Sequence, residues 1–540
     1  MKKIKIVTVL FLSLCTVITF CLSSCNKNDT TSGTPSNGST NESKNTSGSN
    51  ESKNPEDTSN SQWVDGIVGY LGNGKWGRDM PEFKWKDKKE FKVLVYNNET
   101  QSTYFSEEIE PDLYTTTDQR LSDSVRARNE AIFNKYGVKV KAILCKDVYK
   151  TLKDQLADAS NADNADAAMP FINACSTLAQ EGNLYNLYDF EKDKYIDLSM
   201  PWWDQRANKS LSIADALYFT TGDMSIMQKI VSGCVVFNKD LFATKYPDVD
   251  LYDMVDERKW TFDKMYEYAK EFTYESGGDT GELTYDDTWG LITSLGMSLN
   301  IYQASGGSLC TKNAQDIPVI SLATDENTTN MAKKILDRFN ERGTWAFRAQ
   351  DTGLSGNEMW NKVVQVFGDG HGLFYTSAFS ALKKLRPYES LHYGILPRPL
   401  YNELQTEYFN PCAVNYAYGS VIPMSAPIPE FSAFMLDVIS QESRGDSKTG
   451  ITSAYTDVVL KGKDLDSRSG DMLDKYIFSN ITYDIGLAYA FGAGQDSIAN
   501  VFVQLENNAS SDISSHMLKI TDAVQSKIDE MVENFKNRID

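Results

Sequence analysis

The sequence has few of the residues that metal-dependent and acid–base catalysis use. It contains only three histidines, His371, His392 and His516, and none belongs to an H-E-x-x-H motif, which would place two zinc ligands on one helix. The G-x-S-x-G motif, which carries the nucleophile of α/β-hydrolases, is absent as well. We therefore predict no catalytic residues, no metal site and no cofactor.

Paired cysteines are also missing. Of eight cysteines, three lie in the first 25 residues, and the five that remain are widely spaced without any C-x-x-C pair (Cys145, Cys175, Cys234, Cys310, Cys412). This odd number argues against a disulfide scaffold or a zinc ribbon. We expect buried free thiols.

Positive charge is in short supply. The chain has 54 Lys and Arg against 74 Asp and Glu, a net charge of −20, which becomes −23 if Lys2, Lys3 and Lys5 are removed with a signal peptide. A charge of this sign repels phosphates, so we predict no nucleic-acid partner and no electrostatic binding to anionic lipid.

The one long apolar run is at the N-terminus. Three lysines precede 17 residues from Ile6 to Leu22, and Leu22-Ser23-Ser24-Cys25 matches a lipobox. An uncleaved membrane anchor is the alternative, but the run falls short of the roughly 20 apolar residues that span a bilayer. We predict that residues 1–24 are a lipoprotein signal peptide and that Cys25 is lipidated, which tethers the chain to the extracellular face of a bacterial cell membrane.

Residues 25–62 are predicted to form a disordered linker. Between Asn26 and Gln62, 26 of 37 residues are Ser, Thr, Asn or Gly, so this segment has nothing to bury. The next stretch, Gly69 to Lys75, superficially matches the phosphate-binding G-x-x-x-x-G-K motif. Trp76 stands where that motif needs Ser or Thr, so we predict a surface loop there instead.

Strand and helix patterns alternate where the folded part begins. Phe91 to Asn97 is typical of a strand, 117–136 of a helix that Gly137 ends, and Val138 to Ala142 of a second strand. This order predicts an α/β fold with a mostly parallel sheet, and more than 500 residues predict two lobes. Ligands bind beyond the carboxyl ends of such strands, which selects Tyr96, Asn97 and 171–173.

Other segments are assigned to packing or to solvent. Trp260, Thr261 and Met265 fit a helix start with a hydrophobic staple. The C-terminal helix has a single apolar stripe, which we expect to dock onto a lobe. The carboxylates at 107, 108, 110 and 112 are interpreted as a solvated acidic face, although a glycosidase pair could use such residues.

Several phrases, taken in order, resemble one protein family. They are Val235-Val236-Phe237-Asn238-Lys239-Asp240-Leu241-Phe242, Lys259-Trp260-Thr261-Phe262, Ala304-Ser305-Gly306-Gly307, Phe367 to Phe374, and Tyr393-Gly394-Ile395-Leu396-Pro397-Arg398-Pro399. The sequence from about Phe91 to Pro423 thereby resembles the extracellular solute-binding proteins of ABC importers, in the sugar-type family that includes maltose-binding protein.

The resemblance implies a two-lobed periplasmic-binding-protein-like fold with a ligand cleft between the lobes. We expect lobe one to comprise 91–225 and 363–409, and lobe two 226–362 and 410–540. The resemblance also implies a receptor, not an enzyme, that captures a small solute, with a carbohydrate or oligosaccharide expected, and delivers it to the transmembrane subunits of an ABC permease.

Aromatic and small polar side chains in predicted loops supply the candidate ligand contacts. A sugar presents apolar faces ringed by hydroxyls, which suits flat aromatic rings beside Asp and Asn. The candidates are Asn97, Trp203, Asp223, Trp289, Tyr302, Tyr375, Asn415 and Tyr416. Two alternatives stay open at this point: a secreted carbohydrate-active enzyme, and a receptor of the same fold for peptides or another solute.

Overall fold

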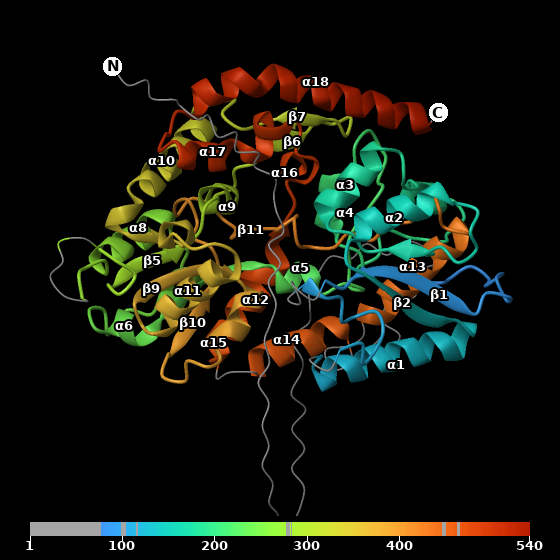
Figure 1. The fold of residues 1–540 in the computed structure, drawn as a ribbon, viewed down its shortest axis with the longest axis horizontal. Helices are drawn as coiled ribbons and strands as arrows, with labels where there is room; N and C mark the ends of the chain where they lie inside the picture. Colours follow the sequence, from blue (N-terminus) through green and yellow to red (C-terminus); the bar gives the residue numbers. More distant parts are fainter. Residues whose placement is uncertain are drawn as a thin grey trace, which may run out of the picture.

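A βαβ unit opens the described part of the chain (Figure 1). The computed structural model describes residues 77–98, 104–114, 117–276, 281, 283–444, 450–461 and 465–539. Cys25, the predicted linker and the Gly69 to Lys75 loop lie outside these ranges, so those predictions stay untested.

The first sheet has the predicted parallel arrangement. Strands β1 (Glu90–Tyr96), β2 (Lys139–Cys145) and β3 (Ala167–Ala168) lie in the order β2-β1-β3, and both pairings with β1 are parallel. Helix α1 (Gln119–Tyr136) begins at Asp118, whose side chain accepts from the Arg120 N–H. It ends at Gly137, which has a φ of 70°, a conformation that glycine adopts at no steric cost. The predicted strand, helix and strand are thus confirmed.

The first sheet and the elements around it form lobe one. Lobe one also includes α2 (Val148–Ala157), α3 (Ile172–Gln180) and α4 (Gln205–Leu211), and the short α5 (Met227–Ile230) leads from it to the second lobe. The second sheet contains β4 (Gly233–Asn238), β5 (Trp289–Thr293), β8 (Ala346–Arg348), β9 (Gly372–Ala378) and β10 (Tyr393–Leu396) in the order β10-β4-β9-β5-β8. Strand β4 runs antiparallel to both of its neighbours. All six residues of β4 are buried, so it belongs to the core of the second lobe, and β9 is the middle strand of the sheet.

The other elements of this lobe surround the second sheet or extend from it. They are α6 (Lys239–Ala243), α7 (Leu251–Asp256), α8 (Phe262–Glu271), α9 (Met297–Ala304), the hairpin β6 (Cys310–Lys312) and β7 (Pro318–Ile320), α10 (Glu326–Asn340), α11 (Gly356–Gly368) and α12 (Phe379–Leu382). Helix α8 begins at Thr261, whose hydroxyl accepts from the Lys264 N–H, as predicted.

The predicted lobe boundaries are wrong in two places. Residues 363–409, expected in lobe one, include β9 and β10, which pair with β4 of the second sheet. Helices α13 (Pro429–Arg444) and α14 (Ile451–Lys461), expected in lobe two, pack against α1 beside the first sheet. Because strand pairing is non-local, a segment's own pattern does not reveal which sheet it joins.

The chain passes between the lobes repeatedly. Strand β11 (Asn410–Pro411) pairs in parallel with β12 (Ile481–Thr482), and α15 (Ser467–Met472) packs against β10 of lobe two. Helix α16 (Ile485–Tyr489) then contacts α3 of lobe one, whereas α17 (Val501–Asn507) contacts α9 and α10 of lobe two. The lobes are therefore joined by several segments that lie far apart in the sequence.

Helix α18 (Ile513–Ile539) lies across both lobes (Figure 1). It contacts α10 and α17 of lobe two and α3 of lobe one. All six residues of the predicted stripe are buried, which confirms that the helix docks: Met517, Ile520, Val524, Ile528, Met531 and Phe535. Near its end, Arg538 donates to the carbonyl of Gln180 at 2.7 Å. Gln180 is the last residue of α3, so the positive charge of Arg538 interacts favourably with the negative end of the helix dipole.

The five cysteines are free thiols as predicted, four of them buried and Cys145 half-buried. Within the described ranges, no helix is both long enough and apolar enough to cross a bilayer.

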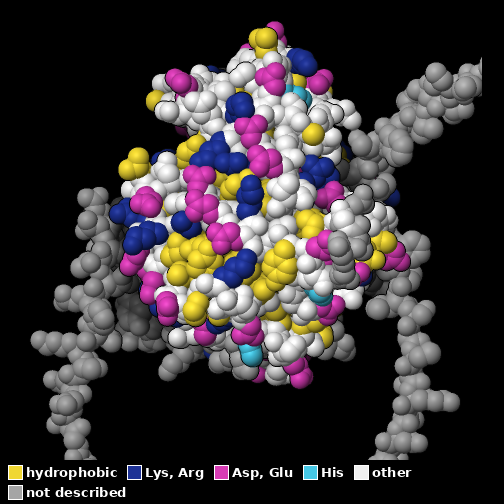
Figure 2. All heavy atoms as spheres, turned by 90° about the vertical axis from the view of Figure 1, so that its left-hand side faces the viewer, with side chains coloured by type: hydrophobic (Ala, Val, Ile, Leu, Met, Phe, Trp, Pro, Cys, Tyr) yellow, Lys and Arg dark blue, Asp and Glu magenta, His cyan; other side chains and the backbone are white. Residues whose placement is uncertain are grey.

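The outer face of lobe two carries charges of both signs side by side (Figure 2). Lysines on or near α8 and α10 form ion pairs with neighbouring carboxylates, including Lys264 with Glu267 and Lys334 with Asp263, both at 2.6 Å. This face therefore presents no extended basic patch.

A buried carboxylate anchors the start of the described chain. Asp437, on α13, is fully buried and accepts from the indole N–H groups of Trp202 and Trp203 at 2.9 and 2.8 Å. The Arg78 Nε donates to its second oxygen at 2.6 Å. One side chain thus joins three distant segments of lobe one.

We predict that Asp437→Ala lowers the free energy of unfolding by about 3–5 kcal/mol, because it removes the counter-charge of buried Arg78 and leaves the Arg78 Nε and two indole N–H groups without an acceptor. Urea denaturation measures the effect. Asp522→Ala, an exposed change on α18, serves as the control and should stay within about 0.5 kcal/mol of wild type. Equal effects of the two substitutions would contradict the role given to Asp437.

Candidate functional site

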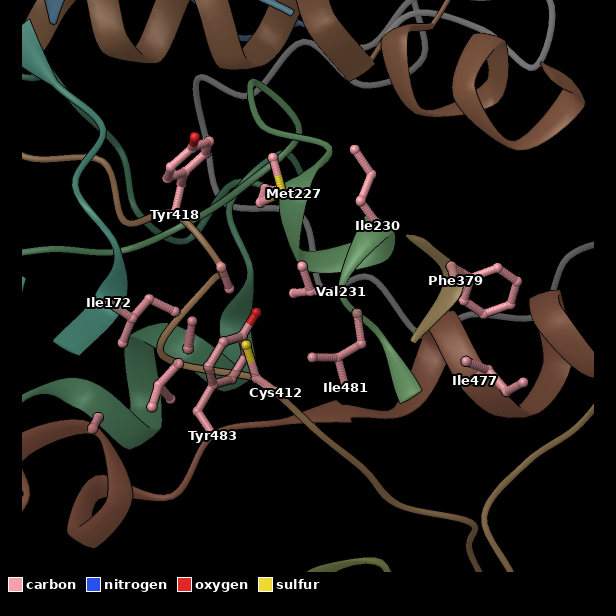
Figure 3. Close-up of a cluster of buried hydrophobic side chains, with 14 of the residues drawn as sticks. Ile172, Met227, Ile230, Val231, Phe379, Cys412, Tyr418, Ile477, Ile481 and Tyr483 are labelled. Atoms are coloured by element: carbon pink, nitrogen blue, oxygen red, sulfur yellow. The ribbon is translucent and has the colours of Figure 1, made fainter. Parts of the chain in front are cut away.

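The carboxyl ends of strands from both sheets meet at one buried apolar cluster (Figure 3). Ile172 comes shortly after β3 of lobe one, Phe379 comes directly after β9 of lobe two, and both side chains belong to this cluster. Between them lie Met227 and Val231 of the crossover near α5. The edges at which ligands bind in α/β sheets therefore face each other across the lobe junction.

Aromatic rings gather at the lobe-one side of this junction. Tyr104 and Tyr416 stack with centroids 4.5 Å apart and an interplanar angle of 13°. Phe171 stacks on Tyr418 at 5.3 Å and meets the edge of Tyr416 at 6.3 Å, while Tyr96 packs on Phe171 at 5.1 Å. We call these five side chains the aromatic shelf. Tyr416 is 41% exposed, so the shelf has a face that a ligand can reach.

One returning segment holds the shelf in place. Residues 418–421 lie antiparallel beside β3, with bridges from Phe171 to Tyr418 and from Ala168 to Val421. The Tyr418 hydroxyl donates to the Tyr104 carbonyl, which fixes the loop that carries the outer ring. A Cβ on Gly419 would lie 2.7 Å from the Cys175 Sγ, so this close approach requires glycine.

The polar groups beside the shelf are neutral amides. The Asn173 Nδ2 donates to the Asn415 Oδ1 at 2.9 Å, and both residues are exposed. Asn97 and Asn98 follow β1 directly, and the Asn97 N–H donates to the Cys145 carbonyl at 2.6 Å. Amides of this kind can donate to and accept from sugar hydroxyls without adding charge.

The shelf tyrosines are also neutral at physiological pH. Burial raises the pKa of Tyr96 to about 12, against a smaller lowering by its hydrogen bond with Asn98. Burial also raises the pKa of Tyr104, and the nearby hydroxyls of Tyr416 and Tyr96 add to the effect. The site therefore offers aromatic rings together with hydroxyl and amide groups. This combination suits a neutral polyhydroxylated ligand.

The loop that carries Tyr104 also faces lobe two. Burial raises the pKa of Glu107, and Lys383, which follows α12, opposes this rise. A lobe-two cation thus lies close enough to a lobe-one carboxylate to influence its ionisation.

The carboxylates of this loop are engaged in holding it. The expectation of a solvated acidic face is wrong for Glu108, which is fully buried and accepts from the hydroxyls of Ser106 and Ser225 at 3.1 and 3.2 Å. Glu110 pairs with Lys141 at 2.6 Å, and Asp112 pairs with Arg126. In the part of the chain that the structure describes, no group of three His, Cys, Asp or Glu side chains could hold a metal ion.

Three of the predicted ligand contacts lie at the shelf. Asn415 and Tyr416 form part of it, and Asn97 directly follows the shelf residue Tyr96, although Asn97 is far from the other two in the sequence. Tyr104 and Tyr418 were not predicted. Nothing in the local pattern around Tyr104 distinguishes it from other loop tyrosines, and its position depends on the hydrogen bond from Tyr418.

Of the other five predicted contacts, four are buried and Asp223 is half-buried. Trp203 is 2% exposed and donates to Asp437, and Asp223 pairs with Arg444 at 3.0 Å while burial raises its pKa. Trp289 donates to the Thr284 carbonyl at 2.7 Å, and Tyr302 and Tyr375 are buried on α9 and β9. Trp203, Trp289, Tyr302 and Tyr375 therefore have packing roles, and Asp223 is half-buried in its ion pair.

A separate cavity of about 120 Å³ lies beside the crossover strands β11 and β12. It is lined by Gln303, 306–308, Phe409, Pro411, Cys412, 482–484 and Leu487, and it includes none of the shelf residues. The shelf therefore does not form the wall of this cavity.

Comparison with known proteins identifies the fold. UspC from M. tuberculosis superposes with a TM-score of 0.50 at 14% identity, over 81% of this chain and 100% of that protein. The chain has the two-lobed solute-binding-protein fold. A cyclo/maltodextrin-binding protein complexed with maltotetraose (TM-score 0.49, 12% identity, 83% of this chain and 98% of that one) is also similar.

The ABC substrate-binding protein Lmo0181 from Listeria monocytogenes, in complex with cycloalternan, is similar as well. It has a TM-score of 0.48 and 14% identity over 83% of this chain and 100% of that one. No family model and no curated protein sequence matches the chain. At 14% identity the likeness to UspC establishes the fold alone.

We predict that Tyr104 and Tyr416 stabilise each other. A double-mutant cycle with Tyr104→Leu and Tyr416→Leu should give a coupling energy of about 0.5–1.5 kcal/mol in urea denaturation. The control cycle pairs Tyr104→Leu with Tyr285→Leu on lobe two, where the effects should add within about 0.5 kcal/mol. Additive effects of the first pair would mean that the two rings do not stack.

Proposed function

We propose that this protein is an extracellular receptor that captures a neutral oligosaccharide at the aromatic shelf and delivers it to an ABC permease. The observation that carries the proposal is the stacked pair Tyr104 and Tyr416, half-exposed beside the Asn173 and Asn415 amides, at the carboxyl edge of the lobe-one sheet. Flat rings accommodate the apolar faces of a sugar, and the amides bind its hydroxyls.

The shelf favours a sugar over a peptide. A peptide or amino acid presents charged termini, which require a carboxylate and a cation placed to receive them. The exposed polar groups of the shelf itself are amides and hydroxyls, while the carboxylates of the neighbouring loop are buried or already paired. Asp147, an exposed carboxylate near Tyr96, accepts from the Lys150 N–H at the start of α2. A neutral ligand therefore matches the site better.

Binding works through closure of the lobes. A ligand on the shelf contacts lobe two only when the lobes close over it, so it binds the closed form more tightly and shifts the population toward it. The permease would recognise this closed form and would supply the energy from ATP. A micromolar dissociation constant, about −8.2 kcal/mol, is sufficient for a receptor that must release its cargo.

The N-terminus provides the anchor in this proposal. Lipidated Cys25 and the linker that follows it would hold the receptor at the extracellular face of the cell membrane. Metabolic labelling with a palmitate analogue, compared between wild type and Cys25→Ala, tests this part. Equal labelling of the two proteins would exclude Cys25 as the lipid site.

A thermal-shift panel tests the ligand class. We predict that a neutral oligosaccharide, and not a peptide, stabilises the purified protein by about 2.7 kcal/mol at 100 times its dissociation constant. Chromatography after incubation should recover the sugar intact. Stabilisation by peptides alone would overturn the sugar assignment, and cleaved sugar would overturn the receptor assignment.

A single substitution locates the binding surface. We predict that Tyr416→Ala weakens oligosaccharide binding at least about tenfold, or about 1.4 kcal/mol, because it removes the exposed ring. Isothermal titration calorimetry measures this affinity. Tyr285→Ala removes a tyrosine that is equally exposed, at 41%, on lobe two and should leave the affinity unchanged. Equal losses in the two variants would contradict the site.

A further inference from the structure

A buried arginine lies where lobe two meets the crossover strands. Arg398 follows β10 and is only 7% exposed. Its guanidinium lies against Gly233, the first residue of β4 after the crossover at α5. A Cβ on Gly233 would lie 1.9 Å from the Arg398 Nη2, so the arginine occupies space that only glycine leaves free.

The charge of Arg398 has no counter-charge in the described chain. None of the ion pairs among the described residues includes Arg398, and its Nε has no hydrogen-bond acceptor there. Nη1 donates to the Asn410 Oδ1 at 3.1 Å. Burial lowers the pKa of the guanidinium to about 10. A buried cation in these surroundings is unfavourable, since it has lost its hydration without gaining an anion.

A second buried arginine shows the difference. Arg128, on α1, is 4% exposed, and each of its three nitrogens donates to an acceptor: the Asn129 Oδ1, the Ser443 hydroxyl and the Ile109 carbonyl. Arg128 therefore has the bonds expected of a structural arginine, whereas Arg398 does not.

The one bond of Arg398 leads to the crossover. Asn410 is the first residue of β11 and pairs with Ile481 of β12. Its Nδ2 donates to the Ile477 carbonyl at 3.3 Å. Ile477 and Ile481 both belong to the apolar cluster at the lobe junction (Figure 3). Arg398, Asn410 and Ile477 thus connect three segments at the point where the lobes join.

We propose that Arg398 is a positioning residue: through Asn410 it holds β11 in the orientation that lets the two lobes close on a ligand, and it does so at a cost in stability. Only the binding measurement in the test below depends on the proposed receptor function. Retention of a destabilising group for a functional geometry is a recognised trade-off.

Arg398→Met tests the proposal, because methionine fills similar space without charge. The melting temperature should be equal to wild type or up to about 4 °C higher. The dissociation constant for the oligosaccharide found in the thermal-shift panel should rise at least about tenfold, measured by calorimetry. Arg398→Lys keeps the charge and a donor for Asn410, so its dissociation constant should stay within about threefold of wild type.

Arg128→Met is the matched control, and it should lower the melting temperature without changing the dissociation constant. If Arg398→Met lowers the melting temperature as Arg128→Met does, Arg398 is a structural residue and the proposal is wrong. If Arg398→Met leaves the dissociation constant unchanged, the proposal is also wrong.

Amide hydrogen exchange is an arm of the test, that is, a second measurement, that needs no ligand. In Arg398→Met, exchange of residues 406–416 should become faster than in wild type, since β11 has lost its hold. Failure of every oligosaccharide to bind wild type would overturn the receptor function but leave this arm and the melting temperature as tests. Unchanged exchange together with a lower melting temperature would overturn the positioning role.

Discussion

The antiparallel contact between residues 418–423 and lobe one is the constraint on which the site depends. This single segment makes bridges to Ala168, Phe171, Leu184 and Thr220. Because it contains Tyr418 and closely follows Tyr416, the contacts that stabilise the lobe place both aromatic rings at the same time. The Tyr418 hydroxyl extends this order to the loop of Tyr104. Packing and site geometry therefore have a common origin.

The lobe junction combines an apolar cluster with directional polar links. Ile172, Phe379 and Ile477 exclude water from the centre, and such contacts are non-directional, so they tolerate a change in the angle between lobes. Hydrogen bonds such as that between Arg398 and Asn410 are directional and restrict the change. Helix α18, which contacts both lobes, adds a further restriction. A receptor needs this balance, because it must close on its ligand and open again.

Local pattern was sufficient to predict the elements of lobe one. The alternation at 138–142, the helical spacing from Leu121 to Ile132 and the glycine at 137 are properties of neighbouring residues, and the structure confirms all three. The six-residue stripe of α18 belongs to the same class. The two-lobed fold itself was inferred from the order of several phrases and not from any one of them.

The site could be predicted only in part, because its contacts join distant segments. The Asn173 and Asn415 amides are 242 residues apart, and no local signal connects them. Trp203 beside Asp204 has the composition of a sugar site, yet its partner is Asp437, 234 residues away in the core. The sequence of β9 has the apolar pattern of a buried strand, which would fit a sheet in either lobe. The prediction therefore placed β9 in lobe one, whereas it pairs with β4 in the second sheet.

The distance between the lobes tests the central claim most directly. Lys150 on α2 and Lys333 on α10 are two exposed positions on different lobes. Spin labels attached at Lys150→Cys and Lys333→Cys report the distance between the lobes by double electron–electron resonance. The account predicts that a saturating oligosaccharide shifts the distribution to a shorter and narrower distance. An unchanged distribution with bound sugar would contradict it.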